Sequence, residues 1–86
     1  MNDSLRLRDQ IWQFVTKNFY VADASSLSDD ASLLDHGIID STGVLELIDF
    51  VESTYGIKVE DDEMVPENLD SINRITAFVA RKKGQV

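Results

Sequence analysis

The sequence contains no cysteine and a single histidine, and it is poor in basic residues. The absence of cysteine excludes disulfides, thiolate metal ligands and a cysteine nucleophile. His36 alone cannot form a cluster of histidine metal ligands. It is also the single imidazole that could act as the base for a serine nucleophile. No apolar run approaches membrane-spanning length, and the N-terminus lacks a secretion signal. We therefore expect a soluble, cytoplasmic protein without membrane insertion.

The length and composition fit one small domain. The chain has 86 residues, of which 43% are hydrophobic, so it can bury a modest core and is not expected to be disordered. We treat residues 1–86 as a single domain in which residues 84–86 form a frayed tail. Nothing in the sequence requires an oligomer, so a monomer is expected.

Negative charge is concentrated in one part of the chain. The net charge is −8, and the window 40–63 contains eight carboxylates against one cation, Lys58. Such a field repels nucleic acid and anionic membranes and attracts basic protein surfaces. Solubility alone also explains an acidic composition, so the charge does not by itself assign a function.

Three segments show apolar residues at the three- and four-residue spacing of amphipathic helices. They run from Asp3 to about Phe19, from Asp40 or Ser41 to Tyr55, and from Asp70 or Ser71 to about Lys83. In the first, Asp3 or Ser4 can cap the helix. The predicted inward-facing residues are Leu7, Ile11, Phe14, Val15 and Phe19, then Val44, Leu47, Ile48, Val51 and Tyr55, then Ile72, Ile75 and Val79, with Trp12 and Phe78 at the edges.

The remaining segments predict one long loop and one short helix. Residues 20–40 show no sustained period, but their leucines can hold a loop against the helix ends, with one helical turn over 32–35 that Gly37 ends. Residues 60–65 predict a short third helix, which Pro66 ends or bends. No strand pattern is present, so the predicted fold class is all-α.

The dipeptide Asp-Ser occurs three times, at Ser4, Ser41 and Ser71, each time where a helix is predicted to begin. The dipeptide is therefore chiefly a helix-capping signal. Ser41 differs in its context, because it joins the leucine-containing loop to the acidic helix. A phosphodiester on its hydroxyl would lie at the positive end of that helix dipole. We interpret Ser41 as a site that can carry a covalently attached group.

The sequence resembles the acyl and peptidyl carrier proteins. The resemblance covers nearly the whole chain and is clearest in three runs, Leu33-Leu34-Asp35-His36-Gly37-Ile38-Ile39-Asp40-Ser41, Leu45-Glu46-Leu47 and Tyr55-Gly56-Ile57. It implies a four-helix bundle with three main helices, a short third helix and a long loop between helices 1 and 2. It also implies a 4′-phosphopantetheine group on Ser41, with Asp40 as its motif neighbour. That group comes from coenzyme A through a phosphopantetheinyl transferase, and its thiol holds the cargo as a thioester.

The same resemblance implies a surface for partner enzymes on the second helix. Its expected residues are Thr42, Leu45, Glu46, Asp49 and Glu52. We also expect Met64 to bind partners, and Met64 or Val65, with the loop leucines, to line the space that shelters a short acyl chain. Many fatty-acid carriers have leucine and an acidic residue where this chain has Thr42 and Gly43. The difference favours a free-standing carrier of a specialised pathway, or an aminoacyl carrier such as the D-alanyl type. Its expected partners are the transferase, a loading ligase and biosynthetic enzymes with basic docking surfaces.

Two alternatives remain open at this point. The first is an unmodified acidic helical module that binds a basic protein partner, in which Ser41 serves only the helix start. The second is a small hydrolase that uses Ser41 with His36, although no nucleophile elbow is present. The favoured hypothesis is the non-catalytic carrier.

Overall fold

The computed structural model describes residues 3–19, 21 and 27–84, with the side chains of residues 3–5 also left undescribed. The predicted cap by Asp3 or Ser4 therefore lies outside the described side chains. The helices are α1 (Asp3–Asn18), α2 (Ser41–Tyr55), α3 (Pro66–Leu69) and α4 (Ile72–Gly84), together with the 3-10 turn η2 (Asp61–Glu63). Across these residues the structure is all-helical, as predicted, and no helix there has the length and hydropathy of a membrane span.

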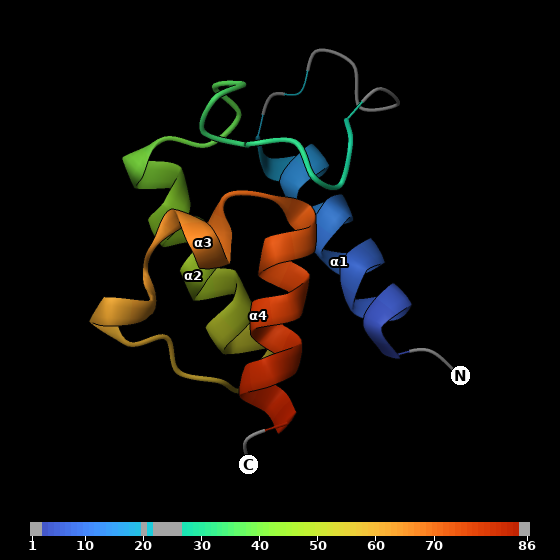
Figure 1. The fold of residues 1–86 in the computed structure, drawn as a ribbon, viewed down its shortest axis with the longest axis vertical. Helices are drawn as coiled ribbons and strands as arrows, with labels where there is room; N and C mark the ends of the chain where they lie inside the picture. Colours follow the sequence, from blue (N-terminus) through green and yellow to red (C-terminus); the bar gives the residue numbers. More distant parts are fainter. Residues whose placement is uncertain (1–2, 20, 22–26, 85–86) are drawn as a thin grey trace.

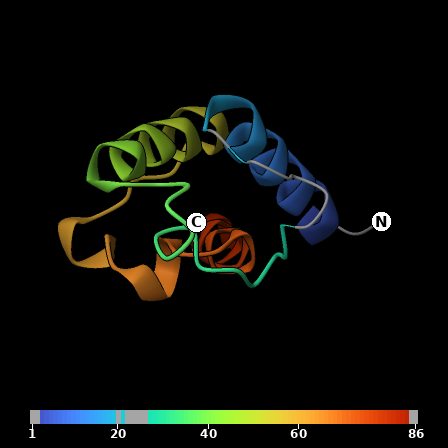
Figure 2. The same ribbon diagram turned by 90° about the horizontal axis from the view of Figure 1, so that it is seen from above.

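The three long helices surround one apolar interior. Figure 1 shows α4 beside α1 and α3, with residues 27–40 of the long loop crossing one end of the bundle. Viewed along the bundle in Figure 2, α1, α2 and α4 lie at the corners of a triangle. Helix α4 is the common packing partner, since α1, α2 and α3 all contact it. This arrangement confirms the predicted bundle of three main helices and one short helix.

The core follows the predicted stripes, with one notable difference. Phe78 was expected at the edge of α4, yet it is only 1% exposed, because α4 has helices on more than one side. Trp12 is partly buried, as predicted. Each fully buried valine, leucine, isoleucine or phenylalanine side chain contributes about 1.5–3 kcal/mol of hydrophobic stabilisation. The buried apolar residues are Leu7, Ile11, Val15, Leu33, Ile39, Leu47, Ile48, Val51, Val59, Leu69, Ile72, Ile75, Phe78 and Val79.

The predicted third helix over residues 60–65 is wrong in position. That stretch contains only the turn η2, and α3 begins at Pro66 rather than before it. Proline is well suited to the first helical position, because its fixed φ matches the helix and the N–H it lacks would have no acceptor there. The proline therefore starts the short helix, whose first turn closes with a 3.0 Å bond from the Asp70 N–H to the Pro66 carbonyl.

Asp70 fastens the long loop to the start of α4. Its carboxylate accepts hydrogen bonds from the Ser32 hydroxyl at 2.6 Å and from the Leu34 N–H at 2.9 Å. Its carbonyl accepts a third from the Leu33 N–H at 2.7 Å. Leu33 is thereby held in the core, where its side chain is fully buried. The expectation that loop leucines hold the segment against the helix ends is confirmed for Leu33, whereas Leu34 is 42% exposed.

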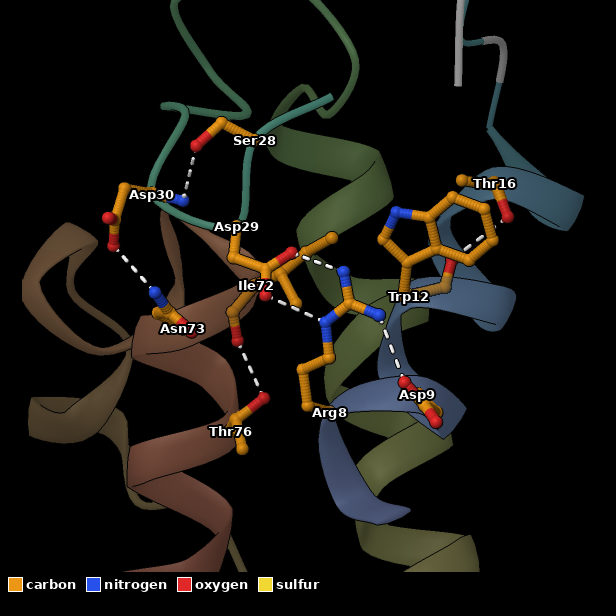
Figure 3. Close-up of polar contacts among 10 residues, drawn as sticks. All are labelled: Arg8, Asp9, Trp12, Thr16, Ser28, Asp29, Asp30, Ile72, Asn73 and Thr76. Carbon is orange, nitrogen blue, oxygen red and sulfur yellow. Dashed lines mark hydrogen bonds and ion pairs between the residues drawn. The ribbon is translucent and has the colours of Figure 1, made fainter. Parts of the chain in front are cut away.

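A second set of polar contacts fastens the preceding part of the loop (Figure 3). Arg8 on α1 binds both carboxylate oxygens of Asp29, with a distance of 2.7 Å between Nε and Oδ2. Asn73 on α4 donates its backbone N–H to the Asp29 carbonyl at 2.9 Å and its side-chain amide to Asp30 at 2.6 Å. The loop thus joins α1 to α4. The Arg8 hydrogen bond holds the pKa of Asp29 below its usual range, despite partial burial, which acts in the opposite direction.

Gly43 permits close contact between the end of α1 and the first turn of α2. A Cβ atom at position 43 would lie 2.9 Å from Cε1 of Phe19 and 3.5 Å from the side chain of Ile39. Gly43 is itself buried, so the phenyl ring lies directly over the helix backbone. The small residue therefore determines how closely α1 can approach the start of α2.

We predict that the Asp29→Asn variant loses stability in a pH-dependent manner. Because the folded pKa of Asp29 is depressed, its ion pair stabilises the protein above the ordinary aspartate pKa of about 4 and fades as pH falls through the lower folded value. Urea unfolding should show a deficit of about 1 kcal/mol at neutral pH that shrinks toward pH 3. Asp9→Asn, which removes the exposed partner of Arg8, is the control. An equal deficit at every pH would contradict the prediction.

We also predict that Gly43→Ala destabilises the fold, although alanine is normally the better helix residue. Crowding of a packed site costs about 1–3 kcal/mol, which exceeds the roughly 0.5–1 kcal/mol gained from helix propensity. Gly84→Ala is the matched control, because no atom lies within 4 Å of its added Cβ. Denaturant unfolding should show recovery when Phe19→Leu is added to Gly43→Ala, and a strictly additive double variant would argue against the contact.

Candidate functional site

Asp40 is the N-cap of α2, and Ser41 is its first residue. The Asp40 backbone is extended, and Oδ1 accepts a hydrogen bond from the Gly43 N–H at 2.8 Å. The first intrahelical bond then runs from the Val44 N–H to the Asp40 carbonyl at 2.9 Å. Of the two predicted helix starts, Asp40 and Ser41, the helix begins at Ser41 and Asp40 caps it. This leaves the Ser41 side chain without a capping role.

The turn before Ser41 fixes the path of the backbone that leads to this residue. Gly37 has a φ of 69°, a left-handed conformation that favours glycine, and it ends the predicted turn. The N–H groups of Ile38 and Ile39 both donate to the Leu33 carbonyl, at 2.9 and 3.3 Å. Ile39 is 3% exposed and anchors the backbone in the core. Ser41 thus follows two residues that are tied to the bundle.

The Ser41 side chain is exposed at the N-terminal end of a four-turn helix. The amides of Ser41 and Thr42 precede the first intrahelical bond, so they and the helix dipole favour an anion nearby. Ser71, in the third Asp-Ser pair, is only 2% exposed, and its hydroxyl accepts a hydrogen bond from the Arg74 N–H at 3.0 Å. The two serines thus differ in accessibility, as their contexts suggested. The side chain of Ser4 is outside the described residues.

An apolar groove of about 310 Å³ opens beside Ser41. Two of its walls contain exposed apolar side chains, Leu34 from the loop and Met64 from the link before α3, which are 42% and 37% exposed. The Lys82–Glu63 ion pair, at 2.8 Å, fastens the backbone before Met64 to α4 and lowers the pKa of Glu63. The groove is lined by Leu33, Leu34, Ile39, Ser41, Val44, Met64, Val65, Pro66 and Leu69.

Most of the expected partner-binding residues lie on the exposed surface of α2. Thr42, Glu46 and Asp49 are exposed, and Leu45 is 61% exposed within this acidic surface. Glu52 differs from its expected exposed position. It is partly buried, and Oε2 accepts a hydrogen bond from the Val59 N–H at 2.9 Å. Its carboxylate therefore holds the segment after α2, a role that a helix-only pattern cannot reveal.

The structure offers no hydrolytic arrangement around Ser41 within its described residues. His36 is an exposed loop residue whose backbone N–H donates to the Ser32 carbonyl at 3.1 Å. No hydrogen bond joins its imidazole to Ser41, so the hydrolase alternative gains no support. The described residues also contain no group of three or more carboxylates and imidazoles placed to hold a metal ion.

One structural feature was missed by sequence reasoning. Phe50 was absent from the predicted stripe of α2, yet its ring stacks on Phe14 of α1 with 4.1 Å between centroids. Phe50 lies on the flank of α2 rather than at its centre, so apolar spacing gave only a weak signal. The one sequence feature that could have indicated this contact is an aromatic residue beside the apolar stripe of α2.

Comparisons with known proteins match most of the chain. Residues 10–79 match the family described as phosphopantetheine attachment site. The D-alanyl carrier protein of Streptococcus pyogenes serotype M5 (strain Manfredo) is 36% identical over 60 residues, which cover 70% of this chain and 75% of that protein. The D-alanyl carrier protein of Streptococcus equi subsp. zooepidemicus (strain MGCS10565) is 38% identical over 56 residues, or 65% of this chain and 70% of that protein.

These matches confirm the resemblance found in the sequence. Membership implies a 4′-phosphopantetheine prosthetic group, a transferase that attaches it and pathway enzymes that use it, with the chain as a carrier rather than a catalyst. The match extends from within α1 to within α4. The chain therefore belongs to the family of carrier proteins that have a phosphopantetheine attachment site.

Proposed function

We propose that Ser41 is the attachment residue for 4′-phosphopantetheine, and that residues 1–86 act as a single carrier domain. The observation that carries this proposal is an exposed hydroxyl at the first residue of α2, beside an apolar groove. The helix N-terminus suits the charge of a phosphodiester on this oxygen. Asp40 holds the first turn in place through the Gly43 N–H, which keeps the hydroxyl in a defined position for a transferase.

The groove beside Ser41 fits the neighbouring part of such a group. When bound, 4′-phosphopantetheine supplies a flexible arm whose thiol holds the cargo as a thioester. The mainly apolar walls, about 310 Å³ in extent, suit a short acyl group or the apolar part of the arm. The tether would raise the effective concentration of cargo at whichever enzyme is docked.

We infer that the cargo is a small aminoacyl or acyl group. Both relatives named above are D-alanyl carrier proteins, which favours a D-alanyl or similar aminoacyl thioester. A loading ligase would then be the enzyme that charges the thiol. Because the family resemblance makes coenzyme A the donor of the arm, we further propose that modification takes place in the cytoplasm.

We propose that partners dock over the surface around Ser41. Thr42 and Leu45 provide its polar and apolar centre, Met64 lies beside the groove, and Glu46 and Asp49 provide negative charge. Basic partner surfaces would be attracted to these carboxylates, which mainly accelerates encounter. Glu52 is left out of this surface, because its carboxylate is bound to Val59. A monomer suffices for this role.

We predict that incubation with coenzyme A and a broad-specificity phosphopantetheinyl transferase adds one 4′-phosphopantetheine to the protein, as measured by intact mass. Ser41→Ala should abolish the addition, because it removes the accepting hydroxyl. Ser53→Ala is the matched control, since Ser53 is exposed on the same helix. An unmodified wild-type protein, alongside a carrier that the transferase does modify, would instead favour the acidic interaction module.

We predict that the Glu46→Lys/Asp49→Lys variant is modified more slowly, and that its rate depends less on salt. Both positions are exposed, so helical content should remain unchanged in circular dichroism. Asp61→Lys/Asp62→Lys makes the same change in net charge on the exposed turn η2 and is the control. Equal rates for wild type and the α2 variant across ionic strength would show that these carboxylates do not guide the transferase.

A further inference from the structure

The interface between α1 and α2 is filled by a row of aromatic side chains. Phe14 and Phe50 stack with a 13° angle between rings and 4.1 Å between centroids. Phe19 contacts Phe14 edge-on, and Tyr55 contacts Phe50 edge-on, with centroid distances of 5.8 and 6.0 Å. All four are only partly buried, so apolar ring surface remains accessible.

Two adjoining grooves lie over the stacked pair Phe14 and Phe50, with volumes of about 340 and 310 Å³. Phe14, Asn18, Phe50 and Thr54 line both, and we call the pair the α1–α2 groove. Glu46 and Asp49 line one of the two. The groove therefore has an aromatic floor, a negatively charged wall on α2, and a polar wall on α1 that includes Gln10, Gln13 and Lys17.

The α1–α2 groove is separate from the groove beside Ser41. Phe50 follows Ser41 by nine residues, which is two and a half helical turns, so the two side chains lie on opposite sides of α2 and roughly 14 Å apart along it. None of the residues that line the Ser41 groove lines the α1–α2 groove. Helix α2 is therefore flanked by the apolar groove beside Ser41 on one side and by the α1–α2 groove on the other, and Glu46 and Asp49 border the second.

The carboxylates beside the α1–α2 groove are available for an external cation. The ion pairs among the described residues join Arg8 to two aspartates and Lys82 to Glu63, and none of them uses Glu46 or Asp49. Glu46 and Asp49 are three residues apart on one helix, a spacing at which neighbouring side chains can contact the same cation. The two carboxylates would therefore attract a partner segment that has a cationic side chain next to the apolar side chain in the groove.

We propose that the α1–α2 groove docks a segment of a partner protein that combines an aromatic or aliphatic side chain with an adjacent arginine or lysine. The apolar side chain packs on the Phe14–Phe50 pair, and the cation binds Glu46 and Asp49. A partner held in this way leaves Ser41 and its groove open. The groove therefore acts as an anchoring site that adjoins the docking surface proposed around Ser41 and shares Glu46 and Asp49 with it.

The test uses the unmodified full chain and a synthetic 12-residue amphipathic peptide built from Phe, Leu and Arg. Backbone amide shifts measured by NMR during titration should change most at residues 14, 18, 50 and 54. A second peptide with every Arg replaced by Glu, and a third with every Phe and Leu replaced by Ser, should each bind about tenfold more weakly or worse. Because no modification of Ser41 is needed, this result does not depend on the proposed attachment residue.

Variants locate the binding site. Thr54→Trp should fill the groove from an exposed position and weaken peptide binding about tenfold, whereas Ala77→Trp, on an exposed part of α4, should not. Glu46→Lys/Asp49→Lys should weaken binding more than Asp61→Lys/Asp62→Lys, although the net charge changes equally. Phe50→Leu, which keeps an apolar side chain at the floor, should give a smaller loss.

Three results would overturn the proposal. The first is peptide binding that Thr54→Trp leaves unchanged. The second is a set of shifts centred on Val44 and Met64, which would place the peptide in the groove beside Ser41. The third is concentration-dependent dimerisation that Thr54→Trp abolishes, which would make a second copy of the chain the occupant.

Discussion

The position of the site depends on one carboxylate, that of Asp70, which ties the long loop to the start of α4. Asp70 receives three hydrogen bonds from residues 32–34, two through its carboxylate and one through its carbonyl. The Ser32 bond is partly buried, so breaking it would leave polar groups partly shielded from water without a partner. From this fixed point, the two bonds to the Leu33 carbonyl place Ile39 in the core and Asp40 at the helix start. A residue far away in sequence, Asp70, thus helps to determine where Ser41 lies.

The first turn of α2 separates structural from chemical roles. Asp40 caps the helix, Gly43 allows the close contact with Phe19, and Ser41 between them is exposed. The acidic surface is divided in a similar way. Glu46 and Asp49 are exposed, whereas Glu52 binds the backbone of the chain that follows the helix. Only the polar side chains of this helix that make no hydrogen bond within the fold remain exposed to partner molecules.

Much of this architecture could be predicted from the sequence, because α1, α2 and α4 each show apolar residues at helical spacing. The exposure of Ser41 and Leu45 also followed from position on a helix. The incorrect predictions concern features that are determined by contacts between helices or by the surrounding chain. Pro66 both ends and starts helices, so the pattern alone misplaced α3. The burial of Phe78 and the stacking of Phe50 depend on which neighbouring helices approach, and periodicity contains no such information.

The ion pair between Lys82 and Glu63 has a consequence for the shape of the groove beside Ser41. It restrains the backbone on one side, and the Asp70 hydrogen bonds restrain the other, so neither wall can move far as a unit. Adjustment then falls to the side chain of Met64, which is unbranched and has three rotatable bonds. Under the function proposed above, the tethered backbone on both sides and the adaptable Met64 side chain would accommodate cargoes of differing bulk without a change in the helical framework.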